Sequence, residues 1–155
     1  MQRSTYHIIA LLLFTFLIAG CSMLSGDKVY KSPVADNMFV KTQIDDAADT
    51  RITVSIKKMS KSCNESNQGD LALPNGDTAF GLWPGQLYSL TVTADSKRLG
   101  GYQQRSTLLR PKPSQAYAAL VRYQNNKFDV KFYKQTSAGN QELGLLPLSA
   151  CKHVQ

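Results

Sequence analysis

The side chains that could carry out catalysis in this sequence are few and scattered. Two histidines occur, His7 and His153, and the second lies within the last three residues, where chains commonly fray. A hydrolase needs a base beside its nucleophile. No nucleophile elbow, P-loop, HExxH or dinucleotide-binding pattern is present. The sequence therefore predicts a protein that is not an enzyme and that uses no cofactor.

No metal site is predicted either. Asp45, Asp46 and Asp49 are close together in the sequence, which is compatible with calcium binding. They lack the spacing and the glycine of an EF-hand loop. We expect these three carboxylates to lie in a solvated turn.

Cys21 ends a segment of the secretory type. Met1-Gln2-Arg3 carries one positive charge, and an apolar run of 13 residues extends from Ile8 to Gly20. A basic start, a short apolar stretch and small residues at the end are typical of a cleaved signal. A membrane-spanning helix needs about 20 residues, so an uncleaved anchor helix is the less favoured alternative.

The residues around the expected cleavage site resemble a known motif. Ile18-Ala19-Gly20-Cys21 resembles the lipobox of bacterial lipoproteins, in which cleavage precedes a cysteine that then carries lipid. The resemblance implies a membrane anchor at Cys21. The resemblance also implies sorting to the outer membrane, because the residue after the cysteine is a serine, Ser22, as in lipoproteins that follow the default route. The expected location is the outer membrane, with the domain in the periplasm or at the cell surface.

With Cys21 carrying lipid, Cys63 and Cys151 are left as an even pair in an oxidising compartment. A disulfide between them would close a loop of 87 intervening residues, for which chain-entropy theory gives up to roughly 4–5 kcal/mol. A metal or redox pair is the alternative. Neither cysteine lies in a CxxC motif, and His153 is the single histidine after residue 20, so zinc would lack its usual ligands.

The charge of the chain indicates the class of partner. Removal of residues 1–20 takes away Arg3 and leaves 17 basic against 11 acidic residues, a net charge of +6. In the envelope such a chain meets lipopolysaccharide phosphates, peptidoglycan carboxylates and acidic proteins. No zinc finger, basic helix or aromatic-interleaved RNA motif is present, so no nucleic-acid partner is expected.

Alternation of apolar and polar residues predicts an all-β fold, and no helix of ten or more residues is expected. About seven or eight short strands separated by turns are typical of an antiparallel β-sandwich or a small barrel. The expected strands are 38–44, 51–57, 78–82, 88–93, 106–109, 116–123, 127–134 and 142–148.

The sequence predicts three regions along the chain. We expect a signal peptide at 1–20, a lipidated tether at 21–37 and one β-sandwich domain at 38–155. The tether is polar and aperiodic, as flexible linkers are; packing of part of it as an edge strand is the alternative. Polar loops are expected at 60–70 and 95–104.

Two surface features are candidates for recognition. Five cations lie within 16 residues and form a candidate surface for an anionic partner, the alternative being a role in solubility alone; they are Lys97, Arg98, Arg105, Arg110 and Lys112. Trp83 precedes Pro84-Gly85, which suit the centre of a type II turn. Its ring would be either an interface anchor or a cap on the open end of the core.

Beyond the lipobox, the predicted domain resembles the small β-sandwich lipoproteins of bacterial envelope machines, such as the outer-membrane lipoprotein of type VI secretion. Pro84-Gly85-Gln86-Leu87-Tyr88 is similar to a Pro-Gly-x-x-Tyr turn that precedes a strand in small lipoproteins. The expected function is non-enzymatic binding of another envelope component, as an assembly factor or anchor of an envelope or secretion complex. The alternative is a binding module or inhibitor for an envelope polymer or a foreign enzyme such as lysozyme.

Overall fold

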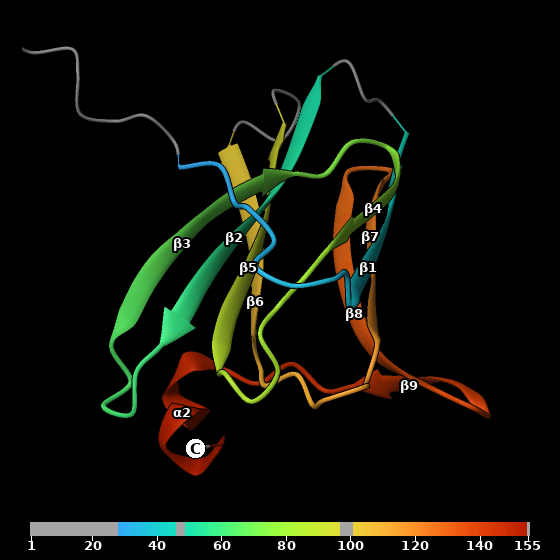
Figure 1. Ribbon diagram of the computed structural model, residues 1–155. Helices are drawn as coiled ribbons and strands as arrows, with labels where there is room; N and C mark the ends of the chain where they lie inside the picture. The colour runs from blue at the N-terminus through green and yellow to red at the C-terminus, as the bar shows by residue number, and fades with distance from the viewer. Residues whose placement is uncertain (1–27, 46–48, 97–100, 155) are drawn as a thin grey trace, which may run out of the picture.

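Two β-sheets face each other in the computed structural model, which describes residues 28–45, 49–96 and 101–154 (Figure 1). The five-stranded sheet has the order β4-β1-β7-β8-β9, and the four-stranded sheet has the order β3-β2-β5-β6. The two sheets remain separate, so the fold is a sandwich and not a barrel. The all-β prediction is confirmed.

The strands of the described part are short and cover most of it. The C-terminus adds a 3₁₀ turn, η2, that continues into one turn of α-helix, α2. The bounds are β1 Met38–Ile44, β2 Thr50–Met59, β3 Glu65–Ala72, β4 Gly76–Phe80, β5 Tyr88–Ser96, β6 Gly101–Leu109, β7 Tyr117–Gln124, β8 Lys127–Thr136, β9 Gly139–Leu143, η2 Leu148–Ala150 and α2 Cys151–Val154.

Period-two alternation puts the apolar residues between the sheets. Ile52, Val54 and Ile56 of β2 are buried, and so are Phe128 and Val130 of β8, because alternate residues of a strand point to the same face. Aligned sheets pack about 10 Å apart, so inward side chains from both sheets interdigitate. The predicted inward faces of these strands are confirmed.

One strand pair departs from the expected antiparallel pattern. β1 pairs with β7 in parallel, from Met38 opposite Tyr117 to Ile44 opposite Tyr123, whereas the other ladders are antiparallel. A parallel pair needs a long connection. The chain supplies one, because β2 to β6 lie between these two strands in the sequence.

Three sequence-based boundaries are wrong. The expected loop 60–70 contains most of β3, whose polar residues are exposed or half-buried and show no alternation, but which pairs through its backbone with β2. Inside the expected loop 95–104, β6 begins at Gly101, and β5 extends to Ser96. The last strand runs over Gly139–Leu143, so the expected strand 142–148 is displaced toward the N-terminus.

Residues 28–37, which we call the N-terminal strap, pack against the sandwich. Figure 1 shows the strap in blue, crossing from β3 to the start of β1. The backbone N–H of Tyr30 donates to the carbonyl of Asp70 at 2.9 Å, and Val29 forms a parallel bridge with Asp70. Residues 28–37 of the expected tether, 21–37, are therefore packed on the domain, with backbone hydrogen bonds that join Lys28 and Tyr30 to Asp70 of β3.

The buried Tyr30 holds the strap in place. Its hydroxyl donates to the carbonyl of Gly81 at 2.6 Å, and its ring meets Phe80 edge-on at a centroid distance of 5.8 Å. Burial, together with the nearby phenol of Tyr88, raises the pKa of Tyr30. The phenol therefore stays protonated and continues to donate to Gly81 at alkaline pH values where an exposed tyrosine would ionise.

The strap packs tightly against the backbone at Gly81. A Cβ at this position would lie 2.1 Å from the carbonyl oxygen of Val34 and 2.8 Å from that of Ala35. Both neighbours are backbone, so neither can move without shifting the strap.

Among the described residues, no helix has the length and apolar character needed to cross a bilayer.

Gly81→Ala is expected to lower the free energy of unfolding by about 1–3 kcal/mol, because the added methyl group forces the strap away from β4. Urea denaturation of the purified chain measures the change. Gly144→Ala is the matched control, since a Cβ there meets no atom within 4 Å and should change stability by no more than about 0.5 kcal/mol. Equal stability of the two variants would contradict the close packing of the strap.

Candidate binding groove at one end of the sandwich

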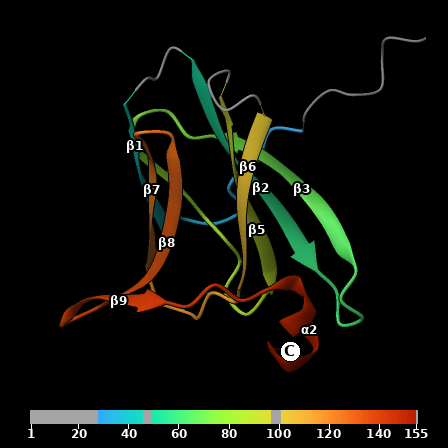
Figure 2. The same cartoon turned by 180° about the vertical axis from the view of Figure 1, so that it is seen from behind.

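Three segments distant in the sequence meet at one end of the sandwich, the lower end in Figures 1 and 2. They are the turn 83–86 before β5, the corner 110–115 between β6 and β7, and the C-terminal segment 144–154. The N–H of Gly85 donates to the carbonyl of Pro111 at 2.7 Å, which joins the first two. The third segment is joined to β6 by two hydrogen bonds of Leu146.

The turn 83–86 follows from its sequence. Gly85 has a φ of +81°, which the third position of a type II turn requires and which glycine adopts without strain. The N–H of Gln86 donates to the carbonyl of Trp83 at 3.3 Å. Trp83 remains 54% exposed, so its ring does not cap the core and is available as an interface anchor.

Prolines form the corner 110–115. Pro111 lies two residues after the end of β6 and has no N–H for a ladder, so the strand cannot continue through it. The N–H of Lys112 donates to the hydroxyl of Tyr117 at 3.2 Å, which leaves the proton of this phenol free to donate elsewhere. The corner therefore presents a rigid backbone with the side chains of Arg110 and Lys112 on it.

The C-terminal segment lies along β6. The N–H of Leu108 donates to the carbonyl of Leu146 at 3.0 Å, and the N–H of Leu146 donates to Oγ1 of Thr107 at 3.0 Å. An unpaired edge of a sheet attracts other strands. Residues near Leu146 cover the end of β6 and form one wall of a depression beside it.

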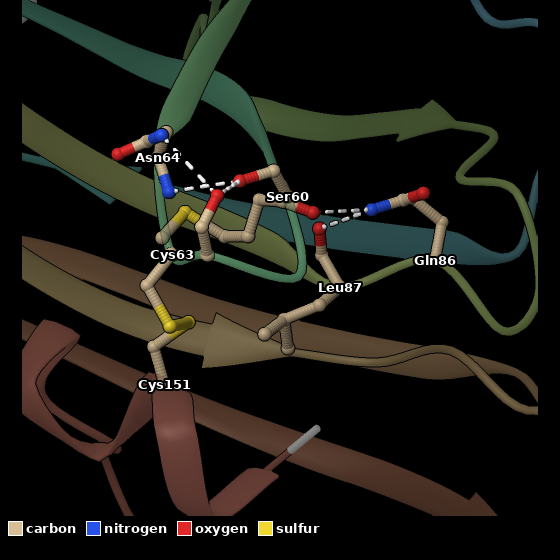
Figure 3. Close-up of a disulfide and its surroundings, with 8 residues drawn as sticks. Ser60, Cys63, Asn64, Gln86, Leu87 and Cys151 are labelled. Atoms are coloured by element: carbon tan, nitrogen blue, oxygen red, sulfur yellow. Dashed lines mark hydrogen bonds between the residues drawn. A yellow bond between two sulfur atoms is a disulfide. The ribbon is translucent and has the colours of Figure 1, made fainter.

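A disulfide attaches the C-terminal segment, which lies along β6, to the loop between β2 and β3 of the same four-stranded sheet (Figure 3). Cys63 and Cys151 are bonded with a Cα–Cα distance of 6.0 Å across 88 residues of sequence. Cys151 is buried in a small apolar cluster with Met59, Leu87 and Leu108. The expected disulfide is present in the structure.

These segments enclose a depression of about 610 Å³ with a mainly apolar lining. Both sheets contribute apolar side chains, among them Leu109, Tyr117 and Phe132. Its lining also includes the cations Arg110, Lys112 and Lys134, and none of its lining residues is acidic. A concave apolar site with a few cations suits a ligand that has both apolar and anionic parts.

A second depression of about 500 Å³ adjoins the first and shares Gly85 and Arg110 with it. It adds Lys58 and Lys61 from the end of β2 and the turn after it, again without an acidic residue. We call the two depressions together the basic groove. Its cations are Lys58, Lys61, Arg110, Lys112 and Lys134.

The cations of the basic groove have no acidic partner in the part of the chain that the structure describes. The ion pairs found there join Lys57 to Glu65 at 2.7 Å and Lys131 to Glu142 at 3.4 Å. Nε of Arg110 is buried without a hydrogen-bond acceptor. Buried donors are normally paired, so the groove carries unmet capacity for an anion.

Of the five cations that the sequence suggested as one surface, the structure brings only two into the basic groove. Arg110 and Lys112 enter the basic groove. Arg105 is exposed on β6, with its Cα roughly 16 Å from that of Arg110 at 3.3 Å per residue. Lys97, Arg98 and the lipidation candidate Cys21 lie outside the described residues.

Sequence reasoning missed the other three cations of the groove. Lys58 and Lys61 precede Arg110 by about 50 residues, and Lys134 follows it by 24. Each lies among other polar residues, and no local spacing connects them. The pairing of β2 with β5 and of β7 with β8 brings them to the same end.

The outer face of the five-stranded sheet has a further depression, of about 560 Å³. Its lining includes Phe39, Ala118 and Tyr133 together with one cation and one carboxylate, Lys41 and Asp77, so it offers no net charge for recognition. In residues 28–45, 49–96 and 101–154, no three side chains of His, Cys, Asp or Glu gather closely enough to hold a metal ion.

Comparison with known proteins gives little further information. No protein-family model matches the chain, and no curated protein matches it. Among solved structures, sea bream transthyretin in complex with thyroxine is similar, with 9% sequence identity and a TM-score of 0.48. The match covers 65% of this chain and 97% of that one. This likeness is too distant to inform function.

Replacement of both Cys63 and Cys151 by alanine is expected to lower the free energy of unfolding by about 2–4 kcal/mol without abolishing the fold. The two sheets keep their core, while the C-terminal segment loses its covalent attachment. Urea denaturation measures the loss, and mass spectrometry without reductant should find the two cysteine peptides linked. Two free thiols, or a double variant as stable as the parent, would overturn the assignment.

Proposed function

We propose that this chain is a non-enzymatic lipoprotein, anchored by Cys21 in the outer membrane, whose β-sandwich binds another cell-envelope component. The basic groove is the observation that carries the binding part of this proposal. It is concave, apolar and free of acidic residues, and its cations are unpaired within the described residues. The lipobox-like sequence Ile18-Ala19-Gly20-Cys21 supports the anchor.

The chemistry of the groove supports binding over catalysis. Its larger depression is lined by apolar residues, cations, Thr107 and the hydroxyl of Tyr117. A general base or a nucleophile paired with one is needed for hydrolysis, and neither histidine nor carboxylate is among these lining residues. The groove can hold and orient an anion, which is a binding role.

The anchor would hold the domain close to the membrane. Six residues, 22–27, separate Cys21 from Lys28, where the packed strap begins. At up to 3.6 Å per residue, the chain from Cys21 to Lys28 spans at most about 25 Å. The domain would therefore stay near the headgroups instead of moving freely through the periplasm.

Cys21→Ser is expected to prevent lipidation and either release the domain into the soluble periplasm or leave the signal uncleaved. The reason is that the acyl chains would be the membrane attachment. Membrane fractionation after a high-salt wash, with mass spectrometry of the N-terminus, measures both results. A processed Cys21→Ser protein that still fractionates with membranes would show that the lipoprotein proposal is wrong.

A photo-crosslinking residue in place of Trp83 is expected to capture an envelope protein in intact cells. The same residue in place of Phe39 is the control, because Phe39 is 42% exposed but lines the other depression. The yield at position 83 should fall with salt, since the Debye length shrinks from about 8 Å at 0.15 M to about 3 Å at 1 M.

Capture at position 39 alone would contradict the role of the groove, and capture at neither position would contradict a protein partner.

A turbidity assay with peptidoglycan distinguishes the alternative function, an inhibitor of lysozyme. Protection of peptidoglycan against lysozyme by the purified chain would replace the envelope-assembly proposal with that of an inhibitor.

A further inference from the structure

We infer that the basic groove binds an extended acidic segment of a protein partner, about six residues long, with at least one apolar side chain. This inference rests on the proposed function, because it assumes that the partner is a protein of the envelope. It adds the chemistry of the recognised segment. Three features of the groove carry it: the spread of its cations, the nature of its floor and its position relative to the start of the described chain.

The cations of the groove form a track instead of converging on one point. Lys58 lies opposite Tyr88, which lies opposite Leu109 beside Arg110. Neighbouring strands are about 4.8 Å apart and packed sheets about 10 Å apart, so a path that crosses from Lys58 over β5 to β6 and then turns to Lys134 on the other sheet is roughly 20 Å long. An extended chain rises about 3.3 Å per residue, which makes this the length of about six residues.

A single headgroup or free phosphate would use only one part of such a track. A segment with several carboxylates can pair with successive cations, because none of them has a carboxylate partner among the described residues. Arg110 lies at the junction of the two depressions, so it would meet the middle of the segment. Its guanidinium can bind a carboxylate with two parallel hydrogen bonds.

The floor of the groove favours a peptide over a polysaccharide. Leu108, Pro111 and Phe132 contribute to the floor, and they offer no side-chain hydrogen bonds to sugar hydroxyls. Removing hydroxyl groups from water without replacement partners costs free energy. A peptide avoids this cost, because its apolar side chains can cover the floor while its carboxylates remain beside the lysines.

The position of the groove favours a partner in the periplasm over lipids of the anchoring membrane. In both views, the described chain begins in the upper part of the domain, whereas α2 and the loops of the groove lie at the lower end (Figures 1 and 2). The first described residues therefore lie away from the groove. The groove stays open to a protein approaching from the other side.

The test is selection from a phage library of random octapeptides on the purified full chain in detergent micelles. We expect enriched peptides to carry at least two Asp or Glu residues and an apolar residue. Their dissociation constants, measured by fluorescence anisotropy, should rise at least tenfold when the acidic residues are replaced by Asn or Gln. A tenfold change corresponds to about 1.4 kcal/mol of binding free energy.

Variants of the chain locate the binding. Lys112→Glu with Lys134→Glu should weaken the selected peptides at least tenfold, whereas Lys31→Glu with Lys127→Glu, of equal charge change and outside the groove, should change binding less than twofold. Lys112→Gln with Lys134→Gln repeats the test without reversed charge. Thermal unfolding of each variant identifies any loss of binding that follows from loss of fold.

Three outcomes would overturn the inference: enrichment of no peptide, enrichment of peptides without acidic residues, or equal weakening by the groove and control variants. Binding of phosphatidylglycerol vesicles or soluble peptidoglycan fragments in place of peptides would assign the groove to lipid or polymer. The test is independent of the anchor. Acidic peptides could bind a chain that fails the Cys21 fractionation test, and a lipidated chain could capture its partner elsewhere while the groove selects nothing.

Discussion

Burial of the two inner sheet faces against each other is the constraint on which the rest of this structure depends. Ile56 and Leu90 from one sheet and Val121 from the other are completely buried, and each buried methylene contributes about 0.8 kcal/mol. Once the sheets are packed, the ends of β2, β6 and β8 must lie near one another. The basic groove is a consequence of this packing, because its walls are the loops that leave those ends.

The two ends of the described chain protect the edges of the four-stranded sheet. The N-terminal strap bridges to β3 through Val29, and the C-terminal segment pairs with β6 through Leu146. Open edges attract foreign strands, so both segments lower the risk of aggregation. The C-terminal segment has a second role, since it also forms a wall of the groove, and Cys63–Cys151 holds this wall in place.

Unpaired cations gathered at one end of a small domain repel one another. At the surface, where the effective dielectric constant is high, two unit charges 4 Å apart interact by about 1–4 kcal/mol, and salt reduces this further. Exposed lysines such as Lys61 and Lys112 tolerate this mutual repulsion because water solvates them. An acidic segment bound in the groove would replace repulsion with attraction, which is the physical basis of the proposed partner chemistry.

The amino-acid sequence was sufficient to predict the fold class, the inward faces of strands such as β2 and β8, and the pairing of Cys63 with Cys151. The fold class and the inward faces follow from period-two alternation, and the pairing follows from the two cysteines that remain when the lipobox-like sequence reserves Cys21 for lipid. The tertiary structure alone decided that β3 is a strand, because its polar residues pair through the backbone. It also decided that the strap packs, through Tyr30, and that Lys58 and Lys134 join Arg110. No local pattern encodes such contacts, because strand pairing brings together residues that the sequence keeps far apart.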